Sequence, residues 1–149
     1  MRALILTLLV ATGGCYTTGL RFPANVRRVC VPVFGNDTYI RGLEFDLTDR
    51  IRGLLLERSP VAITATEAEG DAVIRGKILV CDFPVLVGGR DPKILEGSAR
   101  AVVEATLVDR ATGRVLGRVR GEEQAEFTTP LNETRETALA EVLDELGWK

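Results

Sequence analysis

The sequence predicts an α+β domain, a two-layer sandwich of order β-α-β-β-β-α in which two helices cover one face of a mixed sheet of four to five strands. Residues 43–58 and 131–146 place apolar side chains at helical spacing. Residues 72–83, 97–107 and 114–127 alternate apolar and polar side chains, as half-buried strands do. Because each helix has one apolar stripe and each strand one apolar face, both helices are expected on the same side of the sheet.

The first strand is expected at residues 28–33, where every second residue is valine. Pro32 lacks an amide donor, which favours an edge strand or a bulge. A turn at residues 35–37 then leads to the first helix, residues 43–58. Gly53 lies inside this helix and is expected to mark a close contact between helix and sheet.

A short strand rich in β-branched residues follows at 61–66. In the next strand, alternation sets Ile78 and Val80 on the helix side and Cys81 and Phe83 on the other. Residues 85–92, with paired glycines, are expected to form a hairpin loop.

The second half of the sheet is a predicted hairpin. Residues 109–113 carry the turn signal between strands 97–107 and 114–127. Thr129-Pro130 offers a helix cap with proline at the first position, and Gly147 ends the last helix.

The sheet face away from the helices is expected to be basic. Glu104, Glu122 and Asp82 share that face with these cations: Arg28, Arg75, Lys77, Arg100, Arg118 and Arg120. Two interpretations stay open. In the first, these charges form cross-strand ion pairs with one another, which contribute little to stability on an exposed sheet. Alternatively, the face binds an anionic partner such as a phosphorylated glycolipid, since arginine forks suit phosphate, or receives a larger protein.

The first residues are typical of a lipoprotein signal. Met1 and Arg2 give a positive start, residues 3–11 are apolar, and Thr12-Gly13-Gly14 precede Cys15. We therefore expect a signal peptide at residues 1–14 and one lipid-anchored domain at 15–149, with a palmitate-type acyl chain on Cys15. The apolar stretch is far shorter than the about 20 residues that a membrane-spanning helix needs. An ordinary secretory peptide cut elsewhere, or an apolar first strand, are the alternatives.

Composition excludes several function classes. The formal net charge is −2 and no run of Lys or Arg is present, which does not favour a nucleic-acid partner. The chain has no histidine, so the commonest general base and metal ligand are missing, and neither an enzyme nor a cofactor or metal site is expected. Cys30 and Cys81 either form a disulfide or are two free thiols.

Several segments resemble one family. GCY lies at the expected lipidated start, VPVFGNDTYIRGLEFDLTD spans the first strand and helix, and GDAVIRGKI opens a later strand. These motifs are similar to those of LptE, the outer-membrane lipoprotein of lipopolysaccharide assembly, and the similarity covers nearly all of residues 15–149. Tyr16 follows the cysteine directly, where the family has a glycine between them, and the C-terminus is short. Only Cys15 matches a functional residue of the family.

The resemblance implies a non-enzymatic lipoprotein of the outer membrane. Such a protein partners the large barrel protein LptD, assists its assembly and the delivery of lipopolysaccharide to the cell surface, and is located on the periplasmic side or inside the barrel. The alternative is a periplasmic regulatory or secretion-associated lipoprotein of similar topology, such as a cell-wall synthase activator or a secretion-pore component.

Overall fold

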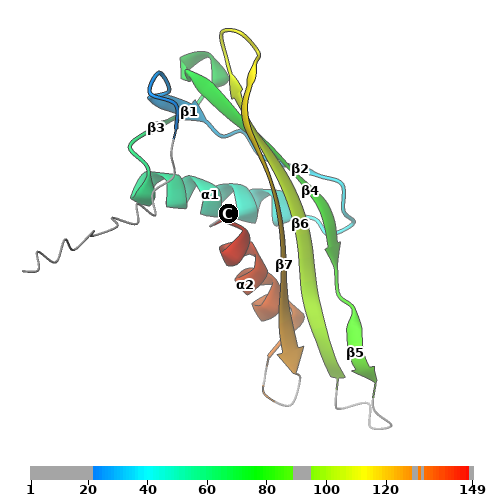
Figure 1. Cartoon of the computed structure of the whole chain (residues 1–149). Coiled ribbons are helices and arrows are strands. Elements are labelled where there is room, and N and C mark those ends of the chain that lie inside the picture. The colour runs from blue at the N-terminus through cyan, green and yellow to red at the C-terminus, as the bar shows by residue number, and fades with distance from the viewer. Residues whose placement is uncertain (1–21, 89–94, 129–130, 132, 148–149) are drawn as a thin grey trace, which may run out of the picture.

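A computed structural model describes residues 22–88, 95–128, 131 and 133–147 of the chain (Figure 1). The elements within these residues follow in chain order: β1 (Arg28–Cys30), β2 (Gly35–Asn36), α1 (Leu43–Arg58), β3 (Ala62–Thr64), the short 3₁₀ helix η1 (Glu67–Glu69), β4 (Ala72–Asp82), β5 (Val85–Gly88), β6 (Leu95–Asp109), β7 (Val115–Thr128) and α2 (Arg135–Gly147).

One mixed sheet forms the first layer. β1 runs parallel to both β3 and β4, β2 continues along β4 in the same direction, and β6 is antiparallel to β4 and β7. β5 extends the β4 side of the sheet by pairing with the start of β6. Both helices lie on the same side of this sheet (Figure 1), which confirms the predicted two-layer α+β architecture.

The first helix has the predicted bounds, Leu43–Arg58. It begins after Gly42, whose φ of 97° lies in the left-handed region that glycine adopts most readily. The predicted close contact between this helix and the sheet at Gly53 is wrong, because a Cβ added to Gly53 would meet nothing within 4 Å. Thr48 of this helix contacts the segment that follows β1, where its hydroxyl accepts from the amide of Phe34 (3.0 Å).

The first strand is interrupted instead of lying at an edge. β1 is an inner strand between β3 and β4, and pairing stops beside Pro32, which has no amide to donate. Arg52 of α1 satisfies the freed carbonyl of Val31, donating to it from Nε (3.1 Å) and Nη2 (2.6 Å). Pairing resumes at β2, so Gly35 and Asn36, expected in a turn, are part of the sheet.

A β-bulge between Ile78 and Val80 changes which residues of β4 face the helices. The extra residue reverses the alternation, so the predicted positions of Val80, Cys81 and Phe83 are wrong. Val80 pairs with Val102 on the open face, whereas Cys81 and Phe83 pack against the helix-side core, where Arg135 of α2 lies 5.7 Å above the Phe83 ring.

Residues 85–88, expected in a hairpin loop, form β5, while the rest of that expected loop lies mostly outside the described residues. The hairpin turn at 109–113 is confirmed. The Asp109 amide donates to the Arg114 carbonyl (2.9 Å), and Gly113 has a φ of 69°.

The last helix begins later than predicted. Thr134 and Thr137 cap it reciprocally, each amide donating to the other's hydroxyl at 2.9 and 3.2 Å. Thr129 and Pro130, the expected cap, lie outside the described residues, and Leu131 is exposed instead of lying on the helical stripe. No helix within the described part of the chain is long and apolar enough to cross a bilayer.

The core lies between the sheet and the two helices. Its most buried members come from β1, α1, β4, β6 and α2, and include these residues: Val29, Leu47, Ile78, Ala99, Ala101 and Val142. Among the described residues, no helix lies over the opposite face of the sheet (Figure 1).

Candidate functional site

The helix-free face of the sheet carries two neighbouring cross-strand rows of cations. In the first row, Arg75 of β4, Thr106 of β6 and Arg118 of β7 lie side by side. Lys77, Glu104 and Arg120 form the second row in the same order. Two residues along each strand separate the rows, so all four cations gather at the end of the sheet nearer the β6–β7 turn.

Two of these four cations have acidic partners at the edge of the face. Arg75 pairs with Glu67 of η1 (2.8 Å), and Lys77 pairs with Asp37 (2.6 Å). Arg118 and Arg120, on the outermost strand, make no ion pair with any residue that the structure describes. Both are exposed, so they are the members of the predicted set that are available to an anion.

Arg100 does not join this group. It lies between Asp82 of β4 (3.7 Å) and Glu122 of β7 (2.8 Å), and these two acids raise the pKa of its guanidinium, Glu122 most of all. Its end of the open face is acidic, because Glu126 and Glu96 follow further along the same face.

Arg28 is also removed from the cluster. Its guanidinium donates to Asp71 (2.9 Å), and the amides of Arg27 and Arg28 donate to the same carboxylate at 3.1 and 3.0 Å. These contacts, the guanidinium first, hold the pKa of Asp71 below its ordinary value. Arg28 therefore ties the start of β1 to the segment before β4.

The open face is thus divided by charge and is not basic throughout. Arg75, Lys77, Arg118 and Arg120 form what we call the basic end, whereas Arg100 lies among acids. Alternation predicts which face a side chain occupies, but it does not predict how charges are distributed along the strands. The ion-pair interpretation holds for Arg28, Arg75, Lys77 and Arg100, and the anion-binding interpretation stays open for Arg118 and Arg120.

The two cysteines are free thiols, so the disulfide alternative is wrong. Cys30 pairs with Val73, whereas Cys81 pairs with Ala101 and lies eight residues further along β4 than Val73. At about 3.3 Å per residue this separates them by roughly 26 Å, far beyond disulfide reach. Burial, and then the neighbouring Asp82, raise the pKa of the Cys81 thiol to about 11.

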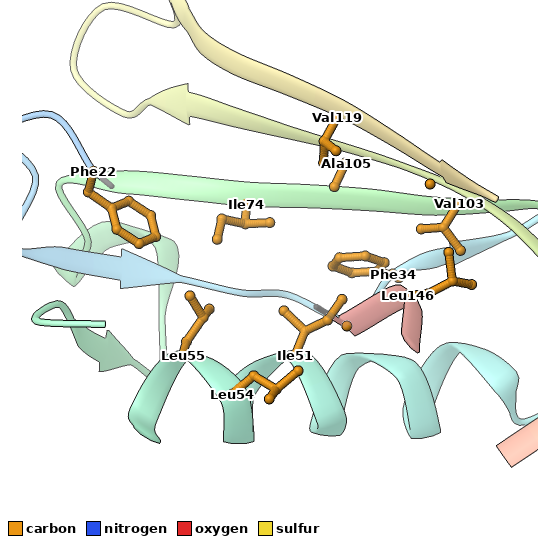
Figure 2. A pocket seen from close by; sticks show the side chains of 12 residues that line it. Phe22, Phe34, Ile51, Leu54, Leu55, Ile74, Val103, Ala105, Val119 and Leu146 are labelled. Atoms are coloured by element: carbon orange, nitrogen blue, oxygen red, sulfur yellow. The ribbon is translucent and has the colours of Figure 1, made fainter. Parts of the chain in front are cut away.

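An apolar cavity of about 140 Å³ lies on the other side of the sheet (Figure 2). Figure 2 shows Ile51, Leu54 and Leu55 of α1 facing Ile74 and Ala105 of the sheet across it. The remaining lining includes these residues: Phe22, Phe34, Val103, Val119, Gly121 and Leu146.

This cavity has the chemistry of a site for a small apolar group. An engineered apolar cavity of comparable volume is known to hold benzene. Val119 is 42% exposed, so the cavity reaches the surface beside β7. The apolar periodicity of the strands and helices does not predict this cavity. The available signal was Gly121, which leaves space on the helix side of β7 where neighbouring positions carry larger side chains.

Cys15, the expected lipidation site, lies outside the described residues.

Solved structures with the same arrangement of helices and strands include the PelC dodecamer from Paraburkholderia phytofirmans, with a TM-score of 0.57 at 13% identity over 85% of this chain and 88% of that one. A minor lipoprotein from Acinetobacter baumannii has a TM-score of 0.54 at 15% identity, covering 81% and 84% of the two chains.

Lipoprotein GNA1162 from Neisseria meningitidis has a TM-score of 0.52 at 12% identity, covering 80% and 94%. No family model and no curated protein matches the sequence. At these identities the similarity is one of fold: the domain has the two-layer α+β architecture that several bacterial lipoproteins share.

Proposed function

We propose that this chain is a non-enzymatic lipoprotein of the outer membrane that acts by docking on other envelope components. A lipid on Cys15 would anchor the domain, in keeping with the signal-like sequence at residues 1–14. The carrying observation is that this expected signal precedes a domain whose fold recurs in proteins described as lipoproteins.

The finer role that we propose is to assist an LptD-like barrel and the delivery of lipopolysaccharide. The family resemblance supports it, and so does the basic end of the open face. Arg118 and Arg120 offer two guanidinium groups to phosphate, with Arg75 and Lys77 beside them in the same rows. No helix in the described part of the chain lies over this face, so a large partner could approach it directly.

A second candidate is a subunit of a secretion-associated pore. The observation in its favour is the fold shared with PelC, whose structure is a dodecamer. A chain of this kind would act through copies of itself, whereas the first candidate would act through a barrel of different sequence.

The experiment begins with affinity purification of the tagged full-length protein from detergent-solubilised outer membranes, followed by mass spectrometry. A stoichiometric barrel protein supports the first candidate, and a ring of identical chains supports the second. Recovery of the protein in a soluble fraction, without lipid label, would contradict the anchor. Cys15→Ser is the matched control, because this variant should lose the palmitate-analogue label and should no longer be recovered in the membrane fraction.

The role of the basic end has its own test. We expect Arg118→Gln combined with Arg120→Gln to weaken lipopolysaccharide or barrel binding, and to reduce its dependence on salt. The matched control is Arg27→Gln with Arg41→Gln, which removes the same charge from exposed residues outside the two rows. Equal loss in both variants, or no loss in either, would leave the basic end without a binding role.

A further inference from the structure

The outer edge of the sheet is the 14-residue strand β7, which pairs with β6 on one side. Within the described residues no strand or helix pairs with its other side. An edge of this length presents a row of unpaired backbone amides and carbonyls, and proteins usually shorten, cover or charge such an edge. β7 carries charged side chains, but the two signs of charge are not mixed along the strand.

The two signs of charge occupy separate halves of β7. On the open face, Arg118 and Arg120 precede Gly121, and Glu122 and Glu126 follow it. Charge of one sign along an edge repels a second copy. When the two signs of charge are separated along the strand, a second antiparallel copy is attracted, because the basic half of each strand lies beside the acidic half of the other.

The helix side of β7 is divided in the same place. α2 covers the second half of the strand (Figure 1), where Ala125 and Phe127 are buried. The first half lies beyond α2, and Val119 is 42% exposed there. An antiparallel neighbour would bring its own covered half, with α2, alongside this exposed valine.

We propose that β7 is a pairing edge for a second copy of this chain, which adds antiparallel across a two-fold axis near Gly121. In that register Arg120 lies opposite Glu122 of the second copy, and Arg118 lies diagonal to Glu122 and Glu126 of the second copy. The open face of the strand is then self-complementary in charge, as an interface on a two-fold axis requires. The paired edges form one continuous sheet, and the mouth of the apolar cavity at Val119 lies within the interface.

The first measurement is the mass of the full-length protein by native mass spectrometry after release from detergent micelles. We expect a dimer for the wild type. The variant Arg118→Glu with Arg120→Glu has an edge of acidic charge only, and its apparent dissociation constant should rise about tenfold or more. The variant Arg27→Glu with Arg41→Glu makes the same change in charge away from β7 and should remain dimeric.

A mixing experiment tests charge pairing directly. Glu122→Arg with Glu126→Arg leaves only basic charge on the open face of this edge, and this variant should also be monomeric. Mixing it with the acidic variant should restore a dimer that contains one copy of each. If loss of the Arg100–Glu122 pair prevents folding, Glu126→Arg alone replaces this variant.

The proposal is overturned if the wild type is monomeric, if the two charge variants remain dimeric, or if the mixture forms no heterodimer while both variants give wild-type thermal unfolding. This outcome is independent of the proposed function, because the dimer test uses neither the barrel nor lipopolysaccharide.

Discussion

Gly76 of β4 lies directly against the ring of Phe34, so that a Cβ built on Gly76 would be 1.9 Å from Cε2 of Phe34. Phe34 is 3% exposed and belongs to the core between the sheet and the helices. The ring can occupy this position only because residue 76 has no side chain. This contact fixes the strand segment between β1 and β2 onto the middle of β4.

Gly76→Ala should therefore destabilise the domain. Forcing a methyl group into a filled core costs about 1–3 kcal/mol, which corresponds to roughly 2–4 °C of melting temperature per kcal/mol for a chain of this size. Gly117→Ala in β7 is the control, since its Cβ would meet nothing within 4 Å. Thermal unfolding of both variants checks the prediction, and equal melting temperatures would contradict it.

Thr48 provides a second buried contact to the same segment. Its hydroxyl accepts from the Phe34 amide (3.0 Å) and donates to the Glu44 carbonyl (2.5 Å), and the residue is fully buried. Thr48→Val removes that acceptor and should lower the free energy of unfolding by about 1–3 kcal/mol. Thr48→Ser keeps the oxygen and should cost less, about 0.8 kcal/mol for the lost methyl group. Urea unfolding gives both values, and a valine variant as stable as the serine variant would refute the prediction.

How far the sequence predicts this fold depends on the kind of signal. Helical spacing gives both bounds of α1, and the turn at 109–113 is correct, because these features are determined by neighbouring residues. The bulge at 78–80 could not be predicted, since Ile78, Leu79 and Val80 are all apolar. Three consecutive apolar residues show no alternation, so the pattern does not indicate which of them face the helices.

The candidate site was predicted in the same partial way. The face of Arg75, Lys77, Arg118 and Arg120 follows from alternation within each strand. The division of that face into a basic and an acidic end depends on the register between strands. This register cannot be derived from the alternation within a single strand. Arg100 shows the difference, because its two acidic neighbours come from β4 and β7.

The stability of the domain should depend on pH through Asp71. Its pKa in the folded state is below the ordinary value, because the Arg28 guanidinium and two backbone amides bind the carboxylate. The unfolded chain then binds a proton more readily, so the stabilisation is present above the unfolded pKa of about 4 and is lost as the pH falls through the lower folded pKa.

Asp71→Asn should therefore be less stable than the wild type at pH 7, and the difference should shrink as the pH falls below about 4. Glu141→Gln, at an exposed position of α2, is the control and should follow the wild-type curve. Melting temperatures measured from pH 7 to pH 3 test this. A wild-type advantage that stays constant over the whole range would show that Asp71 stabilises the fold without its charge.

The last prediction concerns the two thiols. Cys30 is buried and Cys81 is half-buried, with a pKa of about 11 that keeps it protonated at neutral pH. In the folded, unreduced protein, alkylation at pH 7.5 should be slow at both positions. After unfolding in denaturant without reductant, both thiols should react at once. Cys81→Ser should reduce this count by one and leave Cys30 reactive. A count of zero in the unfolded, unreduced wild type would require a bond between the two cysteines, although Cys30 lies in β1 beside Val73 and Cys81 lies near the far end of β4 in this fold.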